Sequence, residues 1–130
     1  MILIATIDPL LRRGLQTTFE KKGEPFMMLE EDSDIVEFTL SFPPSLVILD
    51  LFLSNPSGLE ILRKLRTKGF TGKVVVLGGQ SVQTLTPEAS RLGAFQIVGR
   101  PFNPAHVLGA ARVARGALDN DPEYHHAIDL

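Results

Sequence analysis

Several features common in proteins are missing from this 130-residue sequence. It has no cysteine, which excludes disulfide bonds and thiolate chemistry. None of its apolar runs is long enough to cross a membrane, and Met1 leads into an apolar run without the charged residues of a signal peptide. The net charge of −2 leaves no basic footprint for nucleic acid. We therefore expect a cytoplasmic globular protein with no membrane segment, and no nucleic-acid binding by this domain alone.

The motifs of common enzyme classes are also missing. The residues after the first apolar run, Thr6-Ile7-Asp8-Pro9, contain no glycine-rich phosphate loop. No serine or cysteine stands in a visible nucleophile set with histidine and a carboxylate. The pair His125-His126 has no further histidine or cysteine near it in the sequence, so it is interpreted as a solvated pair. The sequence thus predicts no enzyme.

Short apolar runs alternate with longer helix-like stretches. Five such runs occur, at 2–5, 26–29, 46–49, 74–77 and 95–98. Runs of this length suit strands that are buried on both faces, as in a parallel sheet. Strands that alternate with helices indicate βαβ units and a doubly wound α/β sheet.

The expected helices carry signals at their ends. Asp8-Pro9, Thr86-Pro87 and Asn103-Pro104 place a capping side chain before a proline at the first helical position, and Ser57 with Glu60 forms a capping box. Helices should end at Gly23, Gly69 and Gly93. We expect strands at 2–6, 26–30, 46–50, 73–78 and 95–98, helices at 9–22, 33–42, 57–68, 86–92 and 103–118, and a polar tail or linker at 119–130.

Two of these helices have informative surfaces. In the helix at 57–68, basic residues are expected mostly on the wet face or toward the C-terminus: Arg63, Lys64, Arg66 and Lys68. The helix at 103–118 is rich in glycine and alanine, with Arg112 and Arg115 expected to point outward. Such small side chains would let a partner approach closely, although packing on the protein's own sheet is the simpler interpretation.

The residues that follow the strands are the candidate site. In an open parallel sheet, ligands bind outside the carboxyl ends of the strands. Asp50 ends an otherwise apolar strand, so its carboxylate should be partly desolvated and should need a cation or hydrogen-bond donors. Arg100, after the last strand, is the candidate cation. The other positions at this edge are Thr6, Ile7, Asp8, Gly78 and Gly79.

These segments resemble the receiver domain of two-component response regulators. Residues 44–51, followed by 57–62, are similar to the family's phospho-acceptor segment with Asp50 at the phospho-acceptor position, and Arg100-Pro101-Phe102 is similar to its Lys-Pro-Phe corner. The resemblance covers a domain at 1–118. It implies a flavodoxin-like sheet of five parallel strands in the order 2-1-3-4-5, a role in phosphorelay signal transduction, and a protein partner such as a histidine kinase.

The departures from the family pattern lie at the site itself. The two acidic residues that hold Mg²⁺ in the family fall on Thr6 and Ile7, which are instead expected to pack at the strand end. The hydroxyl residue that ends the fourth strand is Gly78 here, and the lysine after the fifth strand is Arg100. Of the five site positions, only Asp50 is unchanged. Because Mg²⁺ usually binds through one or two carboxylates, Asp50 would offer at most a weak metal site.

The charges that do remain favour a site without metal. Asp8 precedes Pro9, so it suits helix capping better than metal binding. Arginine stays protonated and forms paired hydrogen bonds with carboxylates, so we hypothesise that Arg100 pairs with Asp50 and fixes the domain in one state. Gly78 has no side chain with which to contact a phosphoryl group, so the family's usual signal would be weakened.

The sequence leaves several functions open. A degenerate receiver (pseudo-receiver) would dock a protein partner, or dimerise through residues 86–118, without a phosphorylation switch. A working phospho-acceptor would take phosphate from a histidine kinase on Asp50, with Asp8 helping to hold Mg²⁺. A small-ligand sensor would use the space left by the acidic pair, beside Ile7 and Gly78. Asp50 would otherwise be a purely structural carboxylate.

Overall fold

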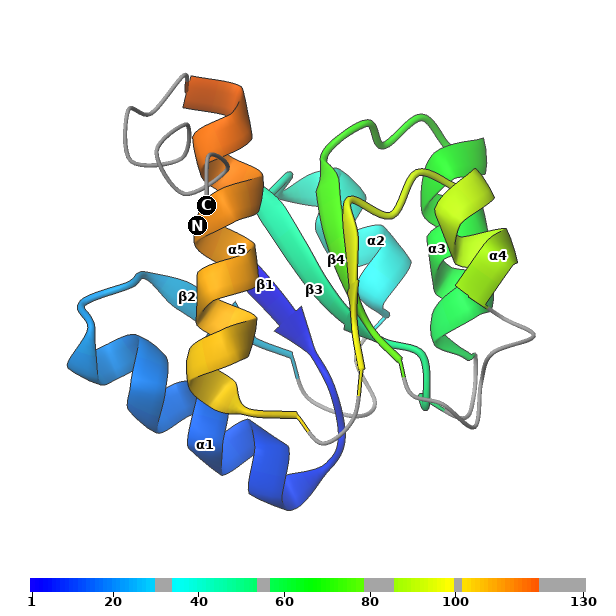
Figure 1. Cartoon of the computed structure of the whole chain (residues 1–130). Helices are drawn as coiled ribbons and strands as arrows, with labels where there is room; N and C mark the ends of the chain where they lie inside the picture. The colour runs from blue at the N-terminus through cyan, green and yellow to red at the C-terminus, as the bar shows by residue number, and fades with distance from the viewer. Residues whose placement is uncertain (30–33, 54–56, 79–85, 100–101, 120–130) are drawn as a thin grey trace.

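The computed structural model describes residues 1–29, 34–53, 57–78, 86–99 and 102–119. Five strands form one parallel sheet in the order β2-β1-β3-β4-β5 (Figure 1). The strands are β1 (Ile2–Ala5), β2 (Phe26–Met28), β3 (Leu46–Asp50), β4 (Lys73–Leu77) and β5 (Gln96–Val98). The helices are α1 (Pro9–Lys21), α2 (Ile35–Ser41), α3 (Gly58–Thr67), α4 (Thr86–Arg91) and α5 (Pro104–Asp119). The expected fold class and strand order are confirmed.

The helix ends follow the capping signals. Asp8 accepts hydrogen bonds from the amides of Leu10 and Leu11 at 3.0 and 3.2 Å, as an N-cap should. Ser57 and Asn103 cap α3 and α5 in the same way. The expected bounds agree with the observed ones to within a single residue, except for two that differ by two: β2 ends at Met28 rather than 30, and α2 begins at Ile35 rather than 33, because Asp34 is its cap. Within the described parts of the chain, no helix has the length and apolar character needed to cross a bilayer.

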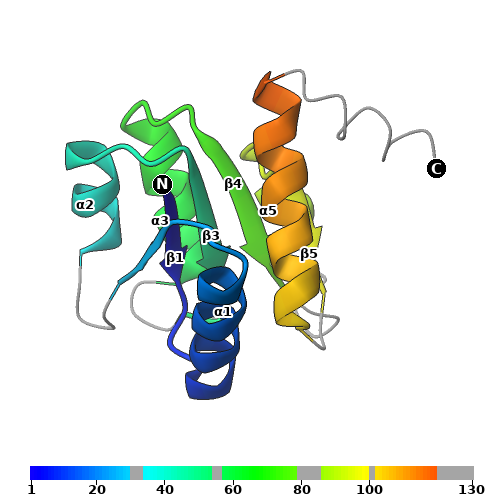
Figure 2. The ribbon, with the colours of Figure 1, turned by 90° about the vertical axis from the view of Figure 1, so that its left-hand side faces the viewer.

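Two helical layers cover the sheet. Helices α1 and α5 lie on one face and α2, α3 and α4 on the other, as Figures 1 and 2 show. Side chains of the central strands point alternately to the two sides, because successive residues of a strand face opposite ways. The side chains that face α2–α4 include Leu3, Val47, Leu49, Val74 and Val76. Those that face α1 and α5 include Ile2, Ile4, Leu46, Ile48, Val75 and Leu77.

The sheet order places the candidate site. β1 lies between β2 and β3, so the chain reverses its winding direction at β1 and β3. Ligands of doubly wound sheets bind at the carboxyl ends of such strands. The register pairs Ala5 with Leu49, which brings the next residues, Thr6 and Asp50, side by side.

Candidate functional site

Asp50 is buried at the carboxyl end of β3. It is only 3% exposed. The first residue of α3, Gly58, packs against its peptide so closely that a Cβ atom built there would lie 2.1 Å from the carbonyl oxygen of Asp50. Only glycine fits this approach, and the helix therefore fixes the backbone from which the carboxylate projects.

Two neutral donors bind the carboxylate of Asp50. The hydroxyl of Thr6 donates to Oδ2 at 2.7 Å, and the amide of Phe52 donates to Oδ1 at 2.8 Å. The bond from Thr6 is buried, since Thr6 is 2% exposed, and the bond from Phe52 is partly buried. A buried carboxylate needs donors to offset its lost hydration, and here each oxygen has one.

Thr6 is itself held from two sides. Its hydroxyl oxygen accepts a hydrogen bond from the amide of Asp8 at 3.3 Å. Its carbonyl accepts one from Arg12 Nη1 at 2.8 Å, and the same nitrogen also donates to the carbonyl of Leu29 at 2.8 Å. Arg12 thus links α1 to the segments that follow β1 and β2. This arrangement fixes the direction in which the Thr6 hydroxyl meets Asp50.

The other predicted site residues have different roles in the structure. Ile7 packs against the core on the α2–α4 side, as expected for a strand end. Asp8 is exposed and caps α1. Gly78 is buried, and its amide donates to the carbonyl of Val98 at 2.9 Å, which joins the ends of β4 and β5.

Part of the predicted site lies outside the described residues. Arg100, Pro101 and Gly79 belong to that part, so the pairing of Arg100 with Asp50 stays a hypothesis. The neighbouring Phe102 is described, and it packs against the core on the α1–α5 side.

The described residues around Asp50 do not fit the Mg²⁺ site of the family. Mg²⁺ requires an octahedron of oxygen ligands, usually including carboxylates. Thr6 turns a donor toward Asp50, Ile7 has no oxygen in its side chain, and Asp8 is engaged by the amides of α1. Across the described ranges, no three histidine, cysteine or acidic residues gather as metal ligands would.

Sequence reasoning missed two contacts of this site. We expected Thr6 only to pack, whereas it also donates to Asp50 across 44 residues of sequence. The signal was present in the strand register, because parallel pairing of β1 with β3 makes these two residues neighbours. The approach of Gly58 to Asp50 was missed as well, because a glycine directly after a capping serine also suits an ordinary helix start.

Comparison with known proteins agrees with this geometry. The family profile of the response regulator receiver domain matches residues 2–112. The chain belongs to this family. It is 28% identical over 129 residues to the photosynthetic apparatus regulatory protein RegA of Rhodovulum sulfidophilum, covering 99% of this chain and 70% of the relative. It is 26% identical over 109 residues to the transcriptional regulatory protein FixJ of Azorhizobium caulinodans, covering 84% of this chain and 52% of FixJ.

Solved structures show the same fold. The receiver domain of NtrX from Brucella abortus matches with a TM-score of 0.76 at 22% identity, over 88% of this chain and 98% of that chain. The chemotaxis protein CheY4 of Vibrio cholerae matches with a TM-score of 0.72 at 16% identity, over 85% and 94%. The chain is thus a receiver domain of a signal-transduction protein. It spans 70% of the length of RegA and 52% of the length of FixJ.

Proposed function

We propose that this chain is a degenerate receiver that presents a fixed surface to a protein partner in a signalling pathway, and that phosphorylation of Asp50 is not its switch. The observation that carries the proposal is the hydrogen bond from the Thr6 hydroxyl to Asp50 Oδ2, at 2.7 Å. In the intact site of the family this place belongs to an acidic residue. A hydroxyl donor there stabilises the Asp50 carboxylate without any metal.

Phosphoryl transfer at this site would meet two obstacles. The donor phosphate and the Asp50 carboxylate repel each other, and Mg²⁺ normally screens that repulsion. The neutral side chains of Thr6 and Ile7 do not replace the carboxylates that hold the ion. The hydrogen bonds from Thr6 and from the amide of Phe52 would also draw electron density from the two oxygens of Asp50, which makes either oxygen a weaker nucleophile.

The partner surface that we propose, residues 86–118, consists of α4, β5 and α5 up to its penultimate residue. On α5 the exposed residues include Ala105, His106, Gly109 and Arg112, and two of them, Ala105 and Gly109, are too small to hinder close approach. The occupant is a signalling protein, either a histidine kinase or a second copy of this chain. The proposal places the protein in the cytoplasm, ends the domain at 118 with a tail or linker at 119–130, and assigns no nucleic-acid binding to the domain itself.

A working phospho-acceptor is the second candidate. Family membership and the position of Asp50 at the end of β3 favour it. It requires a metal ligand in place of the missing acidic pair, and the candidate is Asp8, two residues after Thr6. Because Asp8 Oδ1 accepts from two amides of α1, recruiting that oxygen would cost the helix its cap, roughly 1 kcal/mol.

The test is Mg²⁺-dependent uptake of a phosphoryl group or its analogue. The protein is incubated with acetyl phosphate or beryllofluoride, with and without Mg²⁺, and followed by intact mass and thermal unfolding. We expect no adduct and no Mg²⁺-dependent shift, while a receiver domain with an intact acidic pair serves as the positive control. An adduct that forms only with Mg²⁺ and is lost in Asp50→Asn would overturn the proposal in favour of the second candidate.

A matched pair of substitutions tests the role of Thr6. Thr6→Asp places a second carboxylate beside Asp50, so we expect a lower Tm without metal and a recovery on adding Mg²⁺. Thr6→Ser keeps the donor and should show neither effect. If Thr6→Asp is as stable as wild type without Mg²⁺, the two side chains do not meet as described.

A further inference from the structure

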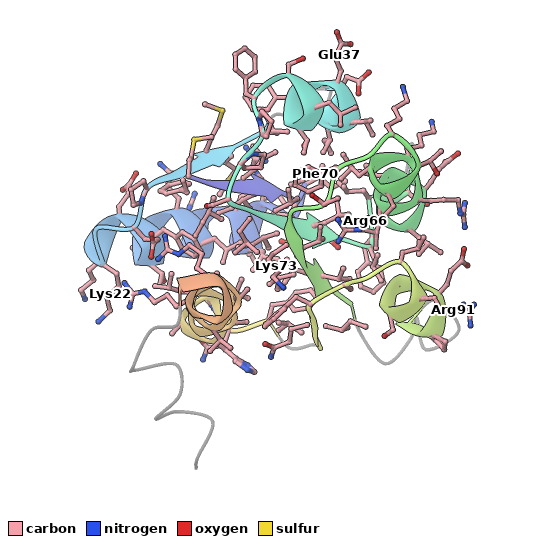
Figure 3. The ribbon with its side chains drawn as sticks, turned by 90° about the horizontal axis from the view of Figure 1, so that it is seen from above. Lys22, Glu37, Arg66, Phe70, Lys73 and Arg91 are labelled. Carbon is pink, nitrogen blue, oxygen red and sulfur yellow. The ribbon has the colours of Figure 1, made fainter. Side chains whose placement is uncertain are left out.

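Arg66, in the last turn of α3, binds four backbone carbonyls at once. Its Nε donates to the carbonyl of Leu92 at 2.8 Å, and Nη2 donates to that of Gly93 at 3.2 Å. Its Nη1 donates to the carbonyls of Phe70 and Gly72, both at 2.9 Å. The guanidinium also lies 5.9 Å from the centre of the Phe70 ring. Figure 3 shows Arg66 turned inward between α3 and α4, next to Phe70.

The four carbonyls belong to two different segments. Phe70 and Gly72 lie in the turn from α3 to β4, whereas Leu92 and Gly93 lie in the turn from α4 to β5. Gly93 adopts a φ of +82°, as glycine commonly does just beyond a helix C-terminus. All four carbonyls lie beyond the last residue of a helix, outside its hydrogen-bond pattern, and a partly buried carbonyl there needs a donor from elsewhere. One side chain therefore supplies donors to the exits of two helices.

The other side-chain contacts of α4 among the described residues are weaker or less directional. α4 has only 6 residues, and a helix this short is not stable by itself. Ala89 is fully buried and anchors the helix by packing. Glu88 forms an ion pair with Arg63, but the two side chains are 35% and 50% exposed, and such surface pairs contribute little. Arg66 thus adds directional side-chain contacts to the backbone hydrogen bonds by which Leu92, Gly93 and Ala94 close the end of α4.

We propose that Arg66 is the positioning residue of α4. Through Arg66, helix α3 sets where α4 ends and where the chain enters β5, and the Asp50 site does not. The surface at 86–118 would then keep one arrangement whatever happens at Asp50. The use of that surface for docking rests on the proposed function, whereas the role of Arg66 in holding α4 does not.

Hydrogen exchange of single amides by NMR tests this role. The reporters are the amides of Leu92, Gly93 and Ala94, which are bonded to carbonyls of α4 at 3.0, 3.0 and 3.1 Å. The reference is the amide of Leu51, bonded to the carbonyl of Leu77 at 3.0 Å, which joins β3 and β4 at their carboxyl ends. In Arg66→Lys a single ammonium nitrogen replaces the three nitrogens of the planar guanidinium, so most of the bonds to the four carbonyls are lost. We therefore expect the reporter amides to exchange about tenfold faster or more, while the exchange rate of the reference amide is unchanged.

Three further variants complete the design. Arg66→Gln removes the charge as well and should accelerate exchange at least as much as Arg66→Lys. Arg63→Gln removes an exposed arginine of the same helix and should leave the reporters at the wild-type rate. Asp50→Asn should also leave them unchanged, because α4 is held from α3.

The outcomes separate cleanly. If Arg66→Lys exchanges like Arg63→Gln, or if the wild-type reporters are unprotected, Arg66 does not hold α4. An equal acceleration at Leu51 would mean a general loss of stability and would also overturn the proposal. Should Arg66→Gln fail to fold, the milder Arg66→Lys decides. A phosphoryl adduct on Asp50 would refute the proposed function yet leave this result standing.

Discussion

The two helical layers are each tied by arginine, but to different acceptors. On the α1–α5 side, Arg115 binds both carboxylate oxygens of Glu24 at 2.6 Å, and Arg112 Nε lies 3.4 Å from Glu24 Oε1. On the other side, Arg66 donates its hydrogen bonds to four backbone carbonyls. The contacts of Arg115 and Arg112 depend on a charged side chain, which a single substitution can remove. The contacts of Arg66 depend on backbone carbonyl dipoles, which every sequence with this backbone would supply. Burial lowers the pKa of Arg66, but arginine stays protonated at neutral pH.

A helical glycine in each layer extends the comparison. In α3, Gly58 faces backbone: a Cβ there would lie 2.1 Å from the carbonyl oxygen of Asp50 and 2.6 Å from Leu51 Cα. In α1, Gly14 faces a side chain: a Cβ there would lie 2.7 Å from Pro104 Cγ. A ring at the start of another helix can shift, whereas the end of a central strand cannot. The same substitution should therefore have different effects in the two layers.

The largest effect is expected from Gly58→Ala. The added methyl overlaps the Asp50 peptide, so either α3 or the end of β3 must move, at a cost of about 3 kcal/mol in the free energy of unfolding. Urea unfolding followed by circular dichroism measures this loss. A loss below about 1 kcal/mol would show that α3 does not approach Asp50 this closely.

The next largest loss of stability is expected from breaking the ion pairs of Glu24 with Arg115 and Arg112 in the α1–α5 layer. Glu24→Gln keeps the shape but removes the charge that Arg115 and Arg112 share, and should cost about 2 kcal/mol, because the Glu24 side chain is only 6% exposed. The arginines are 32% and 47% exposed, which keeps the cost well below that of a fully buried pair.

Salt sharpens this second prediction. Raising NaCl from about 0.05 to about 1 M screens partly exposed charges, so the difference in unfolding free energy between wild type and Glu24→Gln should shrink. The difference between wild type and Arg66→Lys, which rests on directional bonds to carbonyls, should change less. Arg63→Gln, with its exposed partner, serves as the control and should alter stability by less than about 0.5 kcal/mol. Equal salt responses for Glu24→Gln and Arg66→Lys would erase the proposed distinction between the layers.

These ties also show where sequence reasoning reaches its limit. Strands, helices and caps were predictable because their signals are local: an apolar run, a capping Asp8, a glycine after a helix. The contact of Thr6 with Asp50 joins residues 44 apart, and that of Glu24 with Arg115 joins residues 91 apart. We expected Arg115 to point outward, and only the packing of α5 on α1 brings it over a buried carboxylate.

Arg66 illustrates the same limit within a single helix. The pattern of α3 placed it among the basic residues of the wet face or the C-terminal turn. The C-terminal turn is correct, but the guanidinium is half-buried and turned inward because four carbonyls surround it. Backbone acceptors leave no trace in the sequence, so a residue that binds them cannot be told from one that faces water. The family's site could be aligned, yet what replaces its metal could not be deduced without the geometry.

A smaller effect, of opposite sign, is expected in α2. Thr39 is fully buried, and its hydroxyl has no hydrogen-bond partner among the residues that the structure describes. Thr39→Val keeps the shape and removes the unpaired polar group, so it should raise the free energy of unfolding by about 1 kcal/mol. Thr39→Ser keeps the hydroxyl and loses a methyl group, so it should lower it. A loss of stability in Thr39→Val would mean that the hydroxyl is bonded, for instance to a water molecule.

The smallest effect should come from Gly14→Ala, the counterpart of Gly58→Ala. Replacing glycine by alanine inside a helix favours the helix by roughly 1 kcal/mol. The new methyl would meet the Pro104 ring, and a small shift at the start of α5 relieves that contact at a similar cost. The two terms oppose each other, so we expect a change within about 0.5 kcal/mol in the same urea experiment. A loss as large as that of Gly58→Ala would show that α1 and α5 are as rigidly fitted as α3 and β3. The layers would then differ in the chemistry of their ties but not in their tolerance of added volume.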